Sequence, residues 1–267
     1  MGLFGLFDKK TCDLCGGEIG LLGNRKLEDG NCCKECAKKL SPWFDERRHS
    51  TVEQIREQLA YREENKKAVE QFHITRTIAC DSWKVLLDED ARKFILTTDP
   101  GKIRETNPDV ISYEDITGCR VDVDEDQTEI KREVKKGEET VKVSYNPPRY
   151  TYYYSFKYII NVNNPYFTDM SFALNRSRVD ITPAPTAFAA GQAATFDPRT
   201  SPEYMNYENL GAEITEALTG AQQVIRDEIA AANAGPKIVV CPYCTAQTEV
   251  TQDGKCEYCG GYIGDQV

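Results

Sequence analysis

Apolar residues recur at three- and four-residue steps in two stretches of the chain, and each stretch predicts an amphipathic helix. The stripe in residues 51–72 consists of Val52, Ile55, Leu59, Val69 and Phe72, and the polar run 62–67 thins it in the middle. Ser50 and Glu53 have the spacing of a capping box, which places the start of the helix beside them. We expect this helix to link two domains and to pack one face on the domain that follows, and a coiled-coil dimer is the alternative.

The second helical pattern covers residues 203–235. Ser201 and Pro202 form a helix start, and Gly235-Pro236 forms a stop. The apolar stripe consists of Leu210, Ile214, Leu218, Ala221, Ile225 and Ile229. We expect this helix to cap the domain before it, and pairing with a partner helix is the alternative.

The region between the two helices is rich in β-strand patterns. Polar and apolar residues alternate most clearly in residues 119–124, which is typical of a half-buried strand. The predicted strands are residues 74–78, 84–88, 93–98, 109–112, 117–124, 129–134, 140–143, 152–161 and 169–174. Lys136-Gly137 predicts a hairpin turn and Pro147-Pro148 a loop.

Two clusters in this region carry both a structural and a functional interpretation. Tyr150-Thr-Tyr-Tyr-Tyr154 is a dense aromatic run, which we interpret as strand residues that serve the core. A stacking surface for bases or sugars is the alternative. Asp122, Asp124 and the acidic pair Glu125-Asp126 lack the spacing of a calcium loop, so we interpret them as solvated.

Eight of the eleven cysteines form four Cys-x-x-Cys pairs, two at each end of the chain. A set of four thiolates completes a tetrahedral zinc site and leaves no open position for substrate. The sequence therefore predicts two structural Zn²⁺ ions as cofactors, and disulfides or redox pairs are the alternative. The predicted metal ligands are Cys12, Cys15, Cys33, Cys36, Cys241, Cys244, Cys256 and Cys259. Cys32 can compete with Cys33, but the pair spacing favours Cys33.

The N-terminal set lies in a treble-clef-like pattern, with one pair on a hairpin and the other at a helix start. The motif is Cys12-x-x-Cys-Gly-Gly-x-Ile-Gly-Leu-Leu-Gly-Asn-Arg-Lys-Leu-x-Asp-Gly30, followed by Cys33-x-x-Cys36 and Leu40-Ser-Pro-Trp-Phe44. It resembles an uncharacterised bacterial zinc-binding family, domain of unknown function 4428. The resemblance covers about the first fifty residues, and implies a bacterial or phage origin, a metal-binding module and no assigned activity.

The strand-rich region has a second, weaker likeness. Ile111-Ser-Tyr-Glu-Asp-Ile-Thr-Gly-Cys119 resembles the entry to a strand in bacterial pleckstrin-homology-like (PH-like) domains. That resemblance implies a small, strongly bent antiparallel sheet or barrel capped by a C-terminal helix. Such domains act mostly as binding platforms for lipids, peptides or similar domains.

The C-terminal set predicts a zinc ribbon, with two cysteine knuckles on opposed hairpins. Gly260-Gly261 supplies left-handed positions after the second knuckle. Together the patterns predict an α+β multidomain chain. Its predicted segments are a zinc module (1–49), a linking helix (50–72), a PH-like domain (73–182), a linker (183–202), an amphipathic helix (203–235) and a zinc ribbon (236–267).

Charge narrows the range of partners. The net charge is −10, and residues 1–50 carry nine Lys and Arg against eight Asp and Glu. Neither cysteine module has the basic face by which nucleic-acid modules neutralise phosphate. No apolar run reaches the length of a membrane span, and nothing at the start is typical of a signal peptide. We therefore expect a cytoplasmic protein. The apolar segment Met1–Phe7 leaves peripheral attachment to a membrane as an alternative.

With two histidines and no phosphate-binding glycine loop, the sequence has few candidates for catalysis, and we expect no enzyme. The expected function is that of a non-enzymatic zinc-binding adaptor, whose partner is a protein or a membrane surface. A nucleic-acid-binding zinc-ribbon regulator is the first alternative. An enzyme with an unrecognised site is the second. The sequence does not identify the partner or the oligomeric state.

Overall fold

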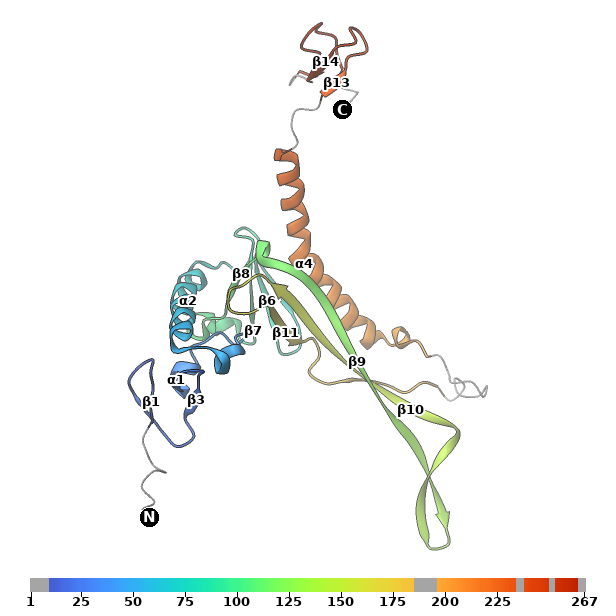
Figure 1. The fold of residues 1–267 in the computed structure, drawn as a ribbon. Helices are drawn as coiled ribbons and strands as arrows, with labels where there is room; N and C mark the ends of the chain where they lie inside the picture. Colours follow the sequence, from blue (N-terminus) through green and yellow to red (C-terminus); the bar gives the residue numbers. More distant parts are fainter. Residues whose placement is uncertain (1–9, 185–195, 234–237, 250–252, 264–267) are drawn as a thin grey trace. The chain divides into compact units, whose positions relative to one another are not determined.

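The computed structural model describes residues 10–184, 196–233, 238–249 and 253–263. The chain divides into two compact units, Met1–Thr219 and Gly220–Val267. Figure 1 shows the course of the chain. The segment Met1–Phe7 and most of the expected 183–202 linker fall outside the described residues.

The first unit begins with two small hairpins and a short helix. β1 (Lys10–Thr11) pairs with β2 (Glu18–Ile19), and β3 (Asn24–Lys26) pairs with β4 (Asn31–Cys33). α1 (Lys34–Ala37) follows β4 directly. This N-terminal module shares a hydrophobic core with the next helix; the buried members are Cys12, Ile19, Leu27, Cys32, Cys36, Leu40 and Ile55.

The first predicted helix is confirmed as α2 (Val52–Gln71), but its cap lies one residue later than expected. Thr51 is the N-cap, and the capping box is formed with Gln54 rather than by Ser50 and Glu53. The Ser50 hydroxyl donates to the Glu46 carbonyl instead. The buried face of α2 is also partly polar, because Gln58, Arg62 and Asn65 lie on it.

An antiparallel sheet of four strands follows α2. Its order is β5 (Arg76–Ala79), β6 (Lys84–Asp88), β7 (Lys93–Thr97) and β8 (Val110–Ser112). The short helix α3 (Ile103–Thr106) lies in the connection between β7 and β8. Phe72 at the end of α2 packs with Leu86 and Ile95 of the sheet, so α2 and the sheet share a core.

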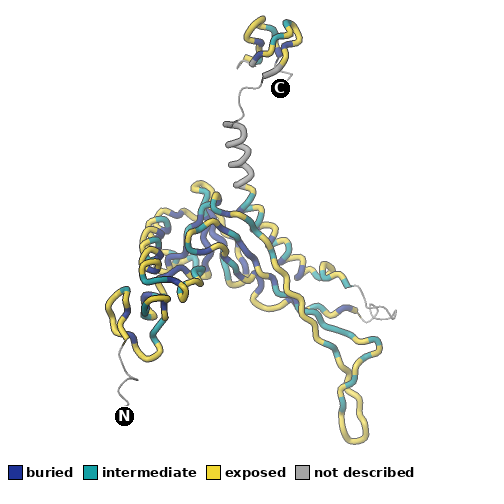
Figure 2. Tube along the Cα trace, viewed as in Figure 1, coloured by how far each residue is buried: buried dark blue, intermediate teal, exposed yellow. Residues whose placement is uncertain are grey.

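The second antiparallel sheet is built around two long strands. β9 (Ile116–Lys136) pairs with β10 (Glu139–Val162) along most of its length. β11 (Asp169–Ala173) and β12 (Val179–Ile181) also pair with β10. Beyond the Thr151–Thr128 pair only β9 and β10 continue among the described residues. They form a two-stranded ribbon that is exposed or half-buried (Figures 1 and 2).

Four of the predicted strands therefore belong to only two observed strands. Residues 117–124 and 129–134 belong to β9, and residues 140–143 and 152–161 belong to β10. The expected turn is confirmed, since Gly137 has a φ of +69°. The expected loop at Pro147-Pro148 is wrong. Both prolines lie within β10, where the pairing shifts register between Ser144 and Arg149, and such an irregularity tolerates proline in a strand.

The second predicted helix is α4 (Pro202–Asn233). Its part in the first unit packs on the second sheet, where Tyr204 lies 4.9 Å from Tyr154 and 5.0 Å from Phe156, centroid to centroid. Gly211 allows this approach, because a Cβ there would lie 2.4 Å from Cγ2 of Val121. Up to Thr219, α4 therefore caps the sheet domain as expected.

The second unit holds the rest of α4 and a small C-terminal module. β13 (Ile238–Val240) pairs with β14 (Gln247–Glu249), and Lys255 forms an isolated bridge with Tyr262. Helix and sheet are thus mixed, with a sheet-rich middle between two cysteine-containing ends. No helix in the described part of the chain is long and apolar enough to cross a membrane.

Candidate metal centres

The N-terminal cysteines converge on one point from two elements. Cys12 and Cys15 come from the turn after β1, whereas Cys33 and Cys36 come from the end of β4 and from α1. The four Sγ atoms all lie within 4.8 Å of one another. The backbone N–H of Cys33 donates to Sγ of Cys12, and that of Cys36 donates to Sγ of Cys33, both at 3.3 Å.

The C-terminal cysteines form a second cluster within the other unit. Cys241, Cys244, Cys256 and Cys259 also have all four Sγ atoms within 4.8 Å of one another. Two of the separations that join the pairs are 3.6 Å between Cys241 and Cys259 and 3.8 Å between Cys244 and Cys256. Cys241 and Cys256 are buried together with Ile263, so the cluster forms the centre of this small module.

Three of the four pairs share one backbone knuckle. In each, the first cysteine donates its N–H to the carbonyl five residues later, and its own carbonyl accepts from the N–H four residues later. The donor–acceptor pairs are Cys12–Gly17 and Gly16–Cys12, Cys241–Ala246 and Thr245–Cys241, and Cys256–Gly261 and Gly260–Cys256. The fourth pair differs because Cys33 is the N-cap of α1.

In each knuckle, the residue four positions after the first cysteine has a positive φ. Gly16 and Gly260 have φ values of +72° and +71° and adopt this conformation without strain. Thr245 takes the same position with a φ of 61°, which is uncommon for a β-branched residue. The expected left-handed role of Gly260 is confirmed. The role expected for Gly261 is wrong, because only Gly260 of that pair has a positive φ.

The spacing of the sulfurs fits a tetrahedral metal ion. Four ligands at about 2.3 Å from a central zinc would lie about 3.8 Å from each other. The separations above match this value, and Sγ of Cys15 lies 3.9 Å from Sγ of Cys33. None of the eleven cysteines, all of them described, is in a disulfide. Each cluster can therefore hold one metal ion, with Cys12, Cys15, Cys33 and Cys36 in one and Cys241, Cys244, Cys256 and Cys259 in the other.

The local environment favours one thiolate in each cluster. Desolvation works against ionisation of Cys12, but backbone N–H groups of Cys33, Cys15 and Leu14 lower its pKa to about 6. Cys256 is similar, since backbone donors at Cys259 and Tyr258 outweigh desolvation and lower its pKa to about 6. A thiolate is the form that ligates a metal, so each cluster offers one ligand already deprotonated near neutral pH.

Other cysteines and histidines lie outside the clusters. Cys32 is fully buried, and burial raises its pKa to about 12. Its Sγ lies 3.3 Å from the carbonyl of Cys33, and Cys33 is the residue whose Sγ joins the cluster. His49 is exposed and belongs to neither cluster. Cys80 is buried and Cys119 is half-buried.

The aromatic run and the acidic cluster of the sheet domain each had a structural and a functional interpretation. Of the aromatic run only Tyr154 is buried, together with Phe156 and Tyr158 farther along β10, whereas Tyr150, Tyr152 and Tyr153 are half-buried. The expected role in the core is therefore confirmed for the end of the run alone. Asp122, Asp124, Glu125 and Asp126 are exposed along β9. Among the described residues, only the two cysteine clusters have a geometry that would hold a metal ion.

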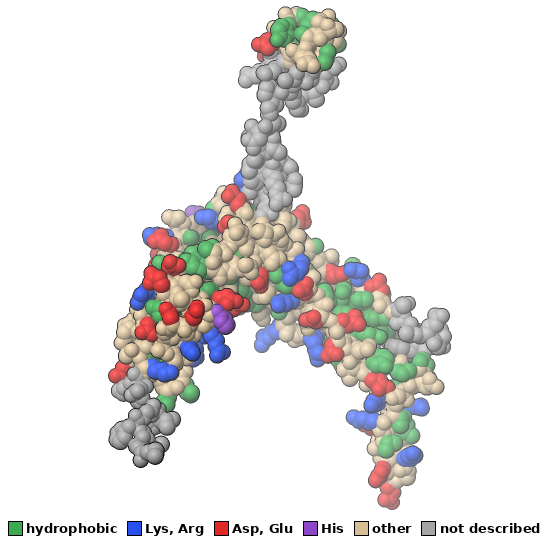
Figure 3. Space-filling view, in the orientation of Figure 1, with side chains coloured by type: hydrophobic (Ala, Val, Ile, Leu, Met, Phe, Trp, Pro, Cys, Tyr) green, Lys and Arg blue, Asp and Glu red, His purple; other side chains and the backbone are tan. Residues whose placement is uncertain are grey.

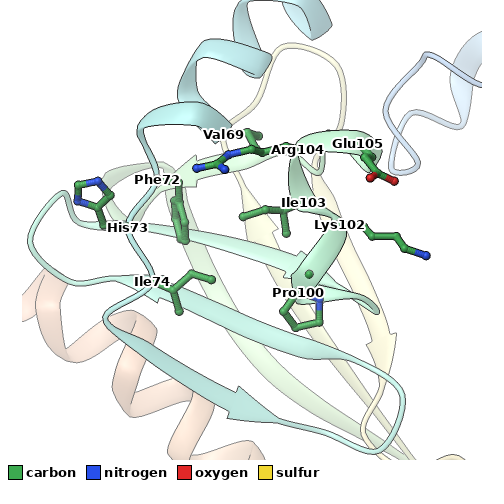
Figure 4. Close-up of a pocket in the computed structure, with 10 residues that line it drawn as sticks. Val69, Phe72, His73, Ile74, Pro100, Lys102, Ile103, Arg104 and Glu105 are labelled. Carbon is green, nitrogen blue, oxygen red and sulfur yellow. The ribbon is translucent and has the colours of Figure 1, made fainter.

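Two of the depressions in the described surface contain none of the predicted site residues. One, of about 600 Å³, lies where α2 ends beside α3. Figure 4 shows Phe72, Ile74, Pro100 and Ile103 around its opening, while Lys102 and Glu105 point away from it. The other, of about 590 Å³, lies between the loop after α1 and the connection from β10 to β11. The Ser-Pro-Trp-Phe motif at residues 41–44 was the available signal for the second.

Comparison with known proteins gives one match. Residues 11–58 match the family model "Domain of unknown function (DUF4428)". This range contains the whole N-terminal cluster and the start of α2, and the family carries no assigned activity. No curated protein and no solved structure matches the chain.

Proposed function

We propose that this protein is a non-enzymatic adaptor: two structural zinc ions stabilise the small modules that precede and follow the sheet domain in the sequence, and surfaces of the chain bind a protein partner. A closed shell of four sulfurs leaves no position for a substrate, so the metal serves the fold. Zinc is the ion that a Cys₄ set of this spacing favours. Small modules such as 238–263 need such a staple because their cores are minimal.

The observation that carries the proposal is the exposure of three tyrosines on the C-terminal module. Tyr243 and Tyr258 are each 71% exposed and Tyr262 is 57% exposed. The ring of Tyr243 lies against Gly261, where a Cβ would come within 2.7 Å of it, and the ring of Tyr262 lies against Gly254 in the same way. Rigid, exposed aromatic rings are enriched at protein interfaces, because they contribute contact area at low entropic cost.

The sheet domain supports a platform of the PH-like kind. Two four-stranded antiparallel sheets share one unit with a C-terminal helix, whose Ile214 and Leu218 are fully buried. These antiparallel sheets with their capping helix are the part of the chain that we propose as the PH-like platform. A protein partner is the occupant we favour, since a chain with a net charge of −10 has little attraction for an anionic membrane. We propose that the protein is located in the cytoplasm.

The metal content is tested directly. Native mass spectrometry of the full-length protein should show two zinc ions per chain. The double variant Cys256→Ser/Cys259→Ser should show one. A wild-type chain that takes up no zinc at micromolar concentration would remove the structural role proposed here.

The adaptor role is tested by affinity capture from a lysate of the source organism, with mass-spectrometric identification. The wild type is compared with Tyr243→Ser/Tyr258→Ser and with Cys256→Ser/Cys259→Ser. A partner that is retained by the wild type and lost in both variants supports the proposal. Zinc stoichiometry shows that the tyrosine variant is still folded. The same proteins retained by all three would exclude the C-terminal module as the contact.

A second candidate, nucleic-acid binding, rests on the β9–β10 ribbon. Figure 3 shows Lys and Arg side chains along the ribbon and acidic ones at its tip. The basic side chains between residues 128 and 150 are Lys131, Arg132, Lys135, Lys136, Lys142 and Arg149. A two-stranded ribbon fits the DNA major groove. Binding of duplex DNA that weakens steeply with salt would support this candidate, and binding that does not depend on salt would exclude it.

A further inference from the structure

The depression between the loop after α1 and the β10–β11 connection has a consistent chemistry. Its aromatic and proline walls are formed by Pro42, Trp43, Pro165 and Tyr166. Asp45, Glu46 and Asp169 also line it, and all three are exposed. None of the described residues that line this groove is Lys or Arg. The groove thus offers ring faces and carboxylates together, with no cation of its own.

Other aromatic rings of the protein pack against the aromatic walls of the groove. The ring of Trp43 lies 5.7 Å from that of Trp83, which lies 5.9 Å from Phe172 of β11. The ring of Tyr166 lies 5.1 Å from Tyr61 and 6.4 Å from Phe44. Trp43 and Tyr166 are nevertheless only half-buried. Each ring therefore has one side packed on the protein and a remaining part accessible at the groove.

A single buried carboxylate ties the two walls together. On one side, Ser41 accepts from the backbone N–H of Trp43 and donates to Asp109 at 2.8 Å. On the other, the backbone N–H of Tyr166 donates to Asn164, the amide of Asn164 donates to Tyr61, and the hydroxyl of Tyr61 donates to Asp109 at 3.2 Å. Asp109 is 1% exposed. The width of the groove is thus set by hydrogen bonds before any ligand arrives, which lowers the entropic cost of binding.

We propose that this groove binds an extended, arginine-bearing peptide segment of the protein partner. A guanidinium stacks on the faces of Trp and Tyr and pairs with carboxylates, so Trp43 and Tyr166 with Asp45, Glu46 and Asp169 present complementary chemistry. Proline and aromatic walls also suit an extended backbone, as in domains that recognise polyproline-type peptides. The inference rests on the adaptor function proposed above and names the class of segment that it recognises.

The test uses the full-length, zinc-loaded protein and a fluorescein-labelled peptide, (Pro-Pro-Arg)₃, in fluorescence anisotropy at about 0.15 M salt, where long-range attraction is screened. The matched control peptide is (Pro-Pro-Gln)₃. The polyamine spermine, which has no peptide backbone, serves as a competitor. The groove variant is Asp45→Asn/Glu46→Gln/Asp169→Asn. The control variant Asp122→Asn/Asp124→Asn/Glu125→Gln removes the same charge from exposed positions of β9.

The groove variant should weaken binding by about tenfold, and the control by less than about twofold. Trp43→Leu should weaken it similarly, with thermal unfolding used to check that the variant is folded. Equal losses in the groove and control variants would overturn the proposal, because the attraction would then be unspecific. Equal binding of the Gln peptide would overturn the role of arginine, and competition by spermine at equal concentration would overturn the role of the peptide backbone.

The two proposals fail separately. If no arginine peptide binds while partners are still captured from lysate through the C-terminal tyrosines, the groove assignment is wrong and the adaptor function stands. If neither the peptide nor any partner binds, both are wrong. If the peptide binds and the groove variant also loses a partner in the capture experiment, the groove is the contact for that partner.

Discussion

The hydroxyl of Ser41 donates a 2.8 Å hydrogen bond to the carboxylate of Asp109, 68 positions along the chain. Ser41 belongs to the segment that matches the domain family, and Asp109 lies just before β8 of the sheet domain. Arg62 of α2 donates to the same carboxylate at 2.6 Å. The N-terminal module, the linking helix and the sheet domain therefore share one buried polar junction.

Asp109→Asn should destabilise the first unit strongly. The substitution leaves the guanidinium of Arg62 buried without a counter-charge, and breaking a buried ion pair costs about 3–5 kcal/mol. Urea unfolding followed by tryptophan fluorescence measures the change. Glu64→Gln serves as the control, because Glu64 pairs with Lys67 at the exposed surface. That variant should stay within about 0.5 kcal/mol of the wild type, and an equal loss in both would contradict the importance of the junction.

Loss of the N-terminal metal site should change the unfolding transition seen by tryptophan fluorescence, and loss of the C-terminal site should not. Both tryptophans, Trp43 and Trp83, lie in the first unit, so their fluorescence reports on that unit alone. Cys12→Ser/Cys15→Ser should lower the midpoint of the tryptophan transition, because the cluster shares a core with Ile55 of α2. Cys256→Ser/Cys259→Ser should leave it unchanged. A shift caused by the C-terminal variant would show that the two units are coupled.

The left-handed position of the first knuckle predicts a glycine-specific effect. Gly16→Ala places a Cβ at a φ of +72°, which costs about 1–2 kcal/mol, although no other atom lies within 4 Å. Gly20→Ala is the matched variant, since Gly20 has the same open surroundings without a positive φ. Zinc competition with a chromogenic chelator should show weaker retention for Gly16→Ala only. Equal retention by both variants would argue against strain at the knuckle.

The two glycines of α4 should respond in opposite directions. Gly211→Ala forces a Cβ against Val121 and should destabilise the first unit by about 1–3 kcal/mol. At Gly220 no atom lies within 4 Å of a built Cβ, so Gly220→Ala should stabilise the helix by up to about 1 kcal/mol. Thermal unfolding followed by circular dichroism at 222 nm, a wavelength standard for helices, compares the pair. A destabilising Gly220→Ala would contradict this account of the helix.

The thiol of Cys80 should react slowly and with an unusual pH dependence. Burial raises its pKa to about 11, so less of it is thiolate at any pH below that value than in an ordinary cysteine. Iodoacetamide labelling, read by peptide mass spectrometry, should be about a hundredfold slower at pH 8 than in urea-unfolded chain. The folded-state rate should still rise between pH 9 and 10, where the unfolded rate levels off. A plateau near pH 9 in the folded protein would contradict the raised pKa.

Local patterns in the sequence were sufficient for the helices and the cysteine clusters. The apolar stripe of α2 and the Pro202 start of α4 depend on neighbours in the chain, and both are confirmed within a residue or two. The Cys-x-x-Cys spacing likewise predicts which sulfurs can meet, because a knuckle is a local turn. The cap of α2 lies one residue later than expected because Ser50 and Thr51 are both good caps, and the hydroxyl of Ser50 instead donates to the Glu46 carbonyl in the preceding turn.

The long ribbon and the groove depend on contacts that no local pattern encodes. The acidic run around Asp124 and the two prolines at 147 and 148 predicted breaks, but pairing between β9 and β10 continues through the first and shifts register at the second. Trp43 and Tyr166 lie over a hundred residues apart in the sequence. They line the same groove only because Asp109 and Tyr61 bring their loops together. The positive φ of Thr245 is not predictable from residue type, because a β-branched residue rarely takes that conformation.

The two-stranded ribbon has a consequence for how the length of this protein can vary. Past the Thr151–Thr128 pair each strand is bonded only to the other among the described residues, so no third element fixes where the ribbon must end. Each added residue per strand extends it by about 3.3 Å. Because side chains alternate between faces, insertion of two residues in each strand keeps Ile130, Val134, Val141 and Val143 on one side, whereas insertion of one reverses the faces beyond it. Related chains should therefore carry ribbons whose reach changes in even steps.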